Sequence, residues 1–207
     1  MTVALAEDRD AQLVVADAPP PAPRRPRVLL VGTVFASAAC VMFFVGLMGV
    51  YLHLRSVGRL HGGTWLPQAV HIPLTQPNVM LFTLLMSSFT VQWAVWAAAH
   101  DDRRHLYLSI GVSLLLAFAF LNQAAYLYTL MGLDVHGNQQ SVLIYTITGA
   151  QLVMLVVAMI FLVLMGFRAL VGQLTSRQHD GISAAAIFWH TTWVVYLLIW
   201  FAIYVTK

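Results

Sequence analysis

The chain has 207 residues, of which 60% are hydrophobic and only 9% are charged, and its formal net charge is +3. A soluble globular domain has roughly 25% charged residues, so this composition excludes an ordinary soluble protein. The positive charge does not indicate nucleic-acid binding, because the arginines lie at the ends of apolar stretches instead of along one face.

Residues 1–27 are expected to form a disordered cytoplasmic tail. The first ten residues include Glu7, Asp8 and Asp10, and they lack the basic start and apolar centre of a signal peptide. The proline-rich segment 19–23 is typical of an extended, flexible chain. A partner-binding arm is the alternative interpretation of this tail.

Five long stretches of residues 28–207 contain no Asp, Glu, Lys or Arg. Each has at least the ~20 residues that a helix needs to cross about 30 Å of hydrocarbon, and a charge at mid-bilayer costs about 2.5–3.5 kcal/mol. The sequence therefore predicts an all-α membrane bundle of five transmembrane helices. The stretches are 28–54, 78–99, 106–133, 141–167 and 182–206.

Lys and Arg counts predict the orientation of the bundle. With a cytoplasmic N-terminus, eight arginines lie on the inner side, and only Arg55, Arg59 and Lys207 lie on the outer side. This asymmetry favours an N-in, C-out topology. The outer connection Arg55–Pro77 is expected to be non-helical, because it is rich in proline.

Four amides inside the spans are expected to face other helices, because an amide in hydrocarbon is costly unless it is hydrogen-bonded. Small residues spaced by four are expected to allow close helix contacts. These pairs are Gly32 with Ala36, Ala94 with Ala98, and Ser109 with Ser113. The four amides belong to Gln92, Asn122, Gln123 and Gln151.

The spans offer little for redox or proton chemistry. Pumps and ion-coupled carriers keep ionisable residues inside the membrane, whereas His190 is the one ionisable residue well within a span here. No two of the eight histidines have the i, i+4 spacing that puts two imidazoles on one helical face. We therefore expect no metal or redox cofactor in this chain, and Cys40 is interpreted as an apolar filler.

Aromatic and polar residues in two spans form a candidate lipid-binding site. Trp189 and His190 stand near the start of the last span, and tryptophan beside a polar group is typical of a membrane interface. Two interpretations of His190 stay open: a hydrogen bond to a neighbouring helix, or recognition of a lipid headgroup. The candidate lipid-binding residues are Trp189, His190, Trp193, Gln92 and Trp96.

Short motifs in chain order resemble subunit III of the haem–copper cytochrome c oxidases. The resemblance covers Val28 to Lys207 and is to the shortened bacterial form that lacks the first two of seven helices. The motifs are Val31-Gly32-Thr33, Met42-Phe43-Phe44, Ser87-Ser88-Phe89-Thr90 with Gln92, Asn122-Gln123-Ala124, Thr148-Gly149, and Trp189-His190.

The resemblance implies a non-catalytic subunit with no catalytic centre of its own, located in the bacterial plasma membrane. Its partners would be oxidase subunits I and II, which carry the haems and copper, and bound phospholipid in a cleft between helices. A cytochrome bc complex, joined to the oxidase in a supercomplex, is a further implied partner.

This chain departs from the family pattern at its membrane acids and histidines. Cys40 stands where an acid usually precedes Met-Phe-Phe, and Trp193 stands where an acid follows Trp-His. Gln151 and Met154 replace two histidines, and no acid follows Gln123-Ala124. These changes argue against proton delivery, whereas lipid binding and scaffolding need only shape and a few polar groups.

Two other functions are considered. The chain could be a subunit-III-like accessory protein of another membrane oxidoreductase, such as a nitric oxide reductase, since that class need not pump protons. A stand-alone small transporter is disfavoured, because the spans lack charges, internal repeats and helix-breaking Gly/Pro pairs.

Overall fold

The computed structural model describes residues 27–60, 74–132, 139–172, 174 and 180–206. Five helices in this part of the chain are long and apolar enough to cross a membrane, which confirms the predicted all-α, five-span fold. The predicted tail, apart from Arg27, lies outside the described residues. The helices are α2 (Val28–Leu60), α3 (Thr75–Ala99), α4 (Arg103–Met131), α5 (Gln139–Leu170) and α6 (Asp180–Ile199), which continues into the π-helical segment η1 (Trp200–Val205).

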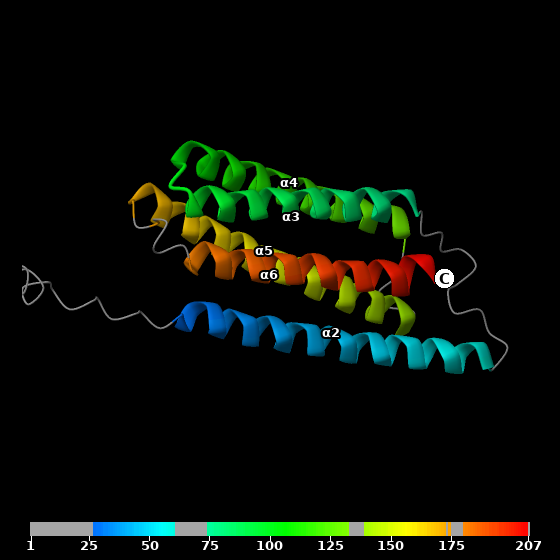
Figure 1. Ribbon diagram of the computed structural model, residues 1–207. Helices are drawn as coiled ribbons and strands as arrows, with labels where there is room; N and C mark the ends of the chain where they lie inside the picture. The colour runs from blue at the N-terminus through cyan, green and yellow to red at the C-terminus, as the bar shows by residue number, and fades with distance from the viewer. Residues whose placement is uncertain (1–26, 61–73, 133–138, 173, 175–179, 207) are drawn as a thin grey trace, which may run out of the picture.

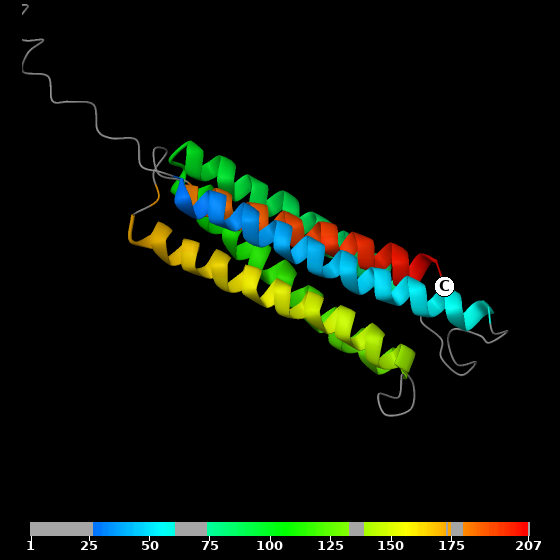
Figure 2. The same ribbon diagram turned by 90° about the horizontal axis from the view of Figure 1, so that it is seen from below.

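The helices form a two-layer bundle. In Figure 1, α3, α6 and α2 lie side by side in one layer, and α4 and α5 lie behind them. Figure 2, seen from below, separates the two layers and shows α5 (yellow) in a different layer from α6 (orange to red). Helix α6 packs against α2, α3 and α5, and α4 packs against α3 and α5.

Helix α6 is the centre of this bundle and α2 is at its edge. In the most apolar 18-residue stretch of each span, half of the residues of the last span are buried, compared with 17% of those of α2. Helix α2 contacts α6 along its length and touches α5 only slightly. The exposed surface of α2 is therefore available to lipid or to another protein.

Helices extend into both ends of the connection Arg55–Pro77, so the expectation that it is wholly non-helical was wrong. Helix α2 continues to Leu60, and α3 begins at Thr75. Pro77 fits in the first turn of α3, because the first four N–H groups of a helix have no intrahelical acceptor.

The tight turn between α3 and α4 is fixed by local hydrogen bonds. Asp102 caps α4, and its Oδ1 accepts from the backbone N–H of His105 at 3.2 Å. Asp101 adopts a left-handed conformation with φ of 55°, which aspartate tolerates better than most residues. At the other end of α4, Gly132 is left-handed with φ of 57° and ends the helix.

The predicted close approach of small residues is confirmed between α3 and α4. Ala94 and Ala98 on α3 are buried, as are Ser109 and Ser113 on α4. The hydroxyls of Thr90 and Ser113 lie 2.7 Å apart across this contact. Small side chains let the two backbones approach, and the hydroxyl pair gives the polar groups a partner in hydrocarbon.

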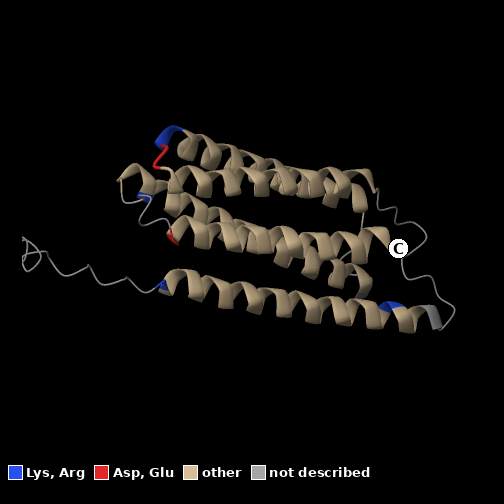
Figure 3. Ribbon diagram, viewed as in Figure 1, with Lys and Arg blue, Asp and Glu red and all other residues tan. Residues whose placement is uncertain are grey.

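Charged residues gather at one end of the bundle. Figure 3 shows arginine and aspartate residues at the end where α4 and α6 begin, and a basic position near the far end of α2. That position is Arg55, which is only 6% exposed. The length between the two ends is apolar, as a membrane-spanning bundle requires.

Candidate functional site

A cleft opens between α2, α5 and α6 near the charged end of the bundle. Its volume is about 370 Å³. The one polar side chain in its wall, Thr33, donates to the carbonyl of Leu29 in its own helix, so the cleft presents an apolar surface. It is lined by Val28, Leu29, Gly32, Thr33, Ala36, Val157, Phe161 and Phe188.

Small residues keep this cleft open on the α2 side. Gly32 and Ala36 present almost no side chain, and a Cβ atom added at Gly32 would meet nothing within 4 Å. The expectation that Gly32 and Ala36 bring two helices into contact is therefore not met. The missing side-chain volume at these positions forms the cleft instead.

Charged side chains stand at the end of the cleft. Arg27, just before α2, forms an ion pair of 3.5 Å with Asp180 at the start of α6. The Arg168 guanidinium lies beside Gly181, so that a Cβ added at Gly181 would be 3.4 Å from it. An apolar cleft that ends among arginines matches an acyl chain that carries an anionic headgroup.

His190 and Gln92 are brought together by the fold. The His190 Nε2 and the Gln92 Oε1 lie 3.2 Å apart and join α6 to α3. His190 is ten residues from Asp180, or about 15 Å along the helix axis. With a 30 Å hydrocarbon core centred on the last span, His190 is about 10 Å inside the core. This contact agrees with the interhelical interpretation of His190 and puts the ring well below the headgroups.

Trp189 lies inside the bundle, with none of its surface exposed. Its indole Nε1 donates to the Ser87 hydroxyl at 3.0 Å. A side chain in this position can shape a lipid site only by positioning its neighbours. The sequence pattern of Trp beside His could not distinguish this interior position from an interfacial one.

The other two predicted lipid-site residues, Trp96 and Trp193, differ in their surroundings. Trp96 is 52% exposed, and its ring is 4.4 Å from the ring of His100. Trp193 is half-buried, and its Nε1 has no hydrogen-bond partner among the described residues. The structure thus joins Gln92 with His190 but does not gather all five predicted residues into one site.

Three of the four predicted interhelical amides are confirmed. Besides Gln92, Gln123 bonds Thr83 on α3 at 3.3 Å, and Gln151 donates to the Thr192 carbonyl on α6 at 3.0 Å. Within this chain Asn122 does not meet the prediction, because its side chain is exposed on the outer surface of α4.

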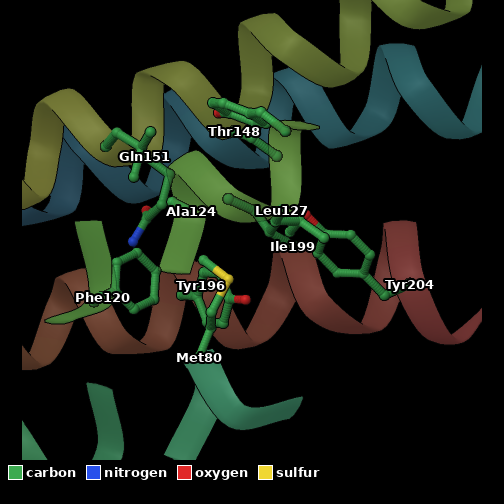
Figure 4. A pocket seen from close by; sticks show the side chains of 11 residues that line it. Met80, Phe120, Ala124, Leu127, Thr148, Gln151, Tyr196, Ile199 and Tyr204 are labelled. Carbon is green, nitrogen blue, oxygen red and sulfur yellow. The ribbon is translucent and has the colours of Figure 1, made fainter. Parts of the chain in front are cut away.

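A small, partly open cavity lies between the helices, toward the end where α6 finishes. Figure 4 shows side chains from α3, α4, α5, α6 and η1 converging on it. Its free volume is about 10 Å³, close to the lower limit for one water molecule. The polar groups in its wall belong to Tyr128, Thr148, Gln151, Tyr196 and Tyr204.

Hydrogen bonds between helices hold the polar groups in the wall of this cavity. Tyr128 donates to the Thr148 hydroxyl at 2.9 Å, and Tyr196 donates to the Pro77 carbonyl at 3.3 Å. Gln151 is 2% exposed, and its Oε1 has no partner. Within the described residues, no three His, Cys, Asp or Glu side chains come close enough to bind a metal ion.

Comparison with known proteins identifies relatives of the whole membrane bundle. Residues 27–207 match the family model for cytochrome c oxidase subunit III. The chain is 29% identical over 168 residues to cytochrome c oxidase subunit 3 of Bos taurus and of Bos mutus grunniens, and 28% identical to that of Pelea capreolus. These alignments cover 79% of this chain and 64% of each relative, so the chain spans about two thirds of their length.

Proposed function

The chain belongs to the cytochrome c oxidase subunit III family, and we propose that it is the non-catalytic, lipid-binding subunit III of a respiratory haem–copper oxidase. The observation that carries this proposal is the family match, which extends over residues 27–207 and so includes all five spans. In this role the chain stabilises the complex, while subunits I and II bind the haems and copper and carry out electron transfer to oxygen.

The chemistry of the spans supports a bracing role. Charged residues lie at the ends of the bundle, and the interior hydrogen bonds join neutral groups such as Trp189 with Ser87 and Tyr128 with Thr148. Hydrogen bonds of this kind fix helices against one another, whereas pumps and proton relays keep ionisable residues inside the membrane.

We propose that phospholipid binds in the cleft between α2, α5 and α6. The apolar wall accommodates an acyl chain, and the charged end lies at the depth of headgroups. This location replaces His190 as the headgroup contact, because His190 lies about 15 Å along α6 from Asp180. Trp189 and His190 then act by holding α6 against α3.

The charge distribution supports a position in the bacterial plasma membrane with the N-terminus inside. The arginines at the starts of α2 and α4 and at the end of α5 lie at one end of the bundle, and positive charge marks the cytoplasmic side. In this orientation the lipid cleft opens toward the inner leaflet. A cytochrome bc complex is a further proposed partner, through a supercomplex.

Affinity purification of the native complex tests this function. A tag after Lys207 should recover haem-bearing subunits, so the visible spectrum of the purified material should show haem bands and the material should consume oxygen. Recovery of the chain without haem absorption would overturn the proposal. A complex that reduces nitric oxide and not oxygen would instead support the accessory protein of a nitric oxide reductase.

A further inference from the structure

The exposed surface of α4 carries a continuous stripe of residues at alternating spacings of three and four. This spacing keeps a stripe on one side of a helix and is the pattern by which two helices pack at a shallow left-handed angle. All seven residues are exposed in the structure. The α4 stripe comprises Leu108, Gly111, Leu115, Phe118, Asn122, Ala125 and Thr129.

Asn122 is the unusual member of the α4 stripe. No side chain in the described part of the chain bonds its amide. It lies nine residues from Met131, or about 13 Å along the axis. With a 30 Å hydrocarbon core centred on α4, Asn122 is about 7 Å inside the core. An unbonded amide in hydrocarbon is strongly unfavourable, so this surface does not suit contact with lipid.

Other exposed surfaces of the bundle show what a lipid-facing helix looks like here. Helix α2 has an exposed stripe of the same spacing, and α5 has a shorter one, but neither contains an amide. Gln92 on α3 is exposed too, yet it has His190 as its partner. The two apolar stripes are Val31, Phe35, Ala38, Met42, Val45, Gly49 and Leu52 on α2, and Val153, Val157, Ile160, Leu164 and Phe167 on α5.

The stripe also leaves room for a neighbouring backbone. Gly111 and Ala125 present minimal side chains on either side of Asn122, and a Cβ added at Gly111 would meet nothing within 4 Å. Small residues in such positions allow helices in lipid to approach closely. A bulky side chain at Gly111 would therefore fit this chain alone but would obstruct a helix packed on α4.

We propose that the α4 stripe is the docking surface for a transmembrane helix of another subunit of the complex, and that this helix presents a hydroxyl or amide group to Asn122. The hydrogen bond to Asn122 sets the depth at which the two helices meet, as a single polar residue sets the register of a coiled coil. Leu115 and Phe118 supply the apolar contact. The identity of the partner as an oxidase subunit rests on the proposed function.

Association of the tagged full chain with its complex tests the docking surface. Asn122→Leu and Gly111→Leu should each lower the amount of partner subunits recovered per inserted chain by about fivefold, which corresponds to about 1 kcal/mol. The matched control is Gly49→Leu, in the apolar stripe of α2, where a Cβ also meets nothing within 4 Å. Equal recovery with Asn122→Leu and wild type, or an equal loss with Gly49→Leu, would overturn the proposal.

Photo-crosslinking identifies what covers the stripe without disturbing Asn122. A photoreactive amino acid at Leu115 should form an adduct with a subunit that co-purifies with the wild-type chain, whereas the same group at Met42 on α2 should form adducts with lipid. Adducts at Leu115 with lipid only, or with a second copy of this chain, would overturn the proposal. An adduct with a co-purifying subunit of a complex without haem would support the stripe and refute the proposed oxidase function.

Discussion

The indole Nε1 of Trp189 donates a hydrogen bond of 3.0 Å to the Ser87 hydroxyl, at a point where neither residue has any exposed surface. The bond joins the central helix α6 to α3 across 102 residues of sequence. Helices in lipid associate through close packing and polar contacts, because lipid competes equally well for apolar surface. This pair therefore fixes the relative position of two spans.

Ser87→Ala should destabilise the bundle by about 1–3 kcal/mol, because it leaves a buried indole N–H without an acceptor. Ser88→Ala is the matched control, since Ser88 is also buried but its hydroxyl bonds Leu84 in its own helix. Thermal unfolding of the detergent-solubilised chain measures both. Equal transition temperatures for the two variants would show that the Trp189 bond is not important for stability.

Gly32→Leu should reduce the phospholipid bound to the purified protein, because the new side chain fills the cleft between α2 and α5. Gly46→Leu is the control, since Gly46 is also open on α2 but does not line the cleft. Mass spectrometry of co-purified lipid gives the ratio of phospholipid to chain. An unchanged ratio in Gly32→Leu would exclude this cleft as the lipid site.

Gly181→Val should weaken the packing of α6 on α5. A Cβ at Gly181 would lie 2.8 Å from the Met165 sulfur and 3.4 Å from the Arg168 guanidinium, so that α6 or these side chains must move. Overpacking of this kind costs about 1–3 kcal/mol. Thermal unfolding with Gly166→Val as a comparison, where the nearest atom is 3.6 Å away, should give the larger loss for Gly181→Val.

Arg55 and Thr206 should show a coupling energy in a double-mutant cycle. The Arg55 Nη1 donates to the Thr206 hydroxyl at 2.6 Å and ties the end of α2 to the end of the last helix. Hydrogen bonds from charged groups contribute about 1.5–3 kcal/mol. The free energies of unfolding of Arg55→Met, Thr206→Val and the double variant measure the coupling, and strictly additive losses would contradict it.

The start of α4 should lose protection as the pH falls below the usual range of aspartate. The hydrogen bond from the His105 side chain lowers the pKa of Asp102 from its ordinary value of 3.8. A lowered pKa in the folded state means that the cap is fully present above pH 3.8 and is lost as the pH falls through the lower, folded value. The protection factor of the His105 amide, which is the intrinsic exchange rate at a given pH divided by the observed rate, should therefore fall under acid. Asp102→Asn should abolish this pH dependence.

The tertiary structure explains why some polar residues were predicted correctly and others were not. Gln123 and Gln151 were expected to bond other helices, and each bonds a residue on a neighbouring span. The same reasoning failed for Asn122, which faces away from its own bundle. The requirement for a partner was a sound physical argument, but nothing in the sequence says which chain provides that partner.

Composition along the chain was enough to predict the number of spans, their approximate limits and the near absence of charge inside them. Those features follow from the energy of moving charge into hydrocarbon, which depends on local composition alone. The packing of the helices was needed to show that Trp189 is interior, that Asn122 is exterior and that Arg55 is buried against Thr206. In a soluble protein, an apolar stripe shows which side of a helix faces the core. These helices are largely apolar on all sides, so packing and not hydropathy sets their rotation about their own axes.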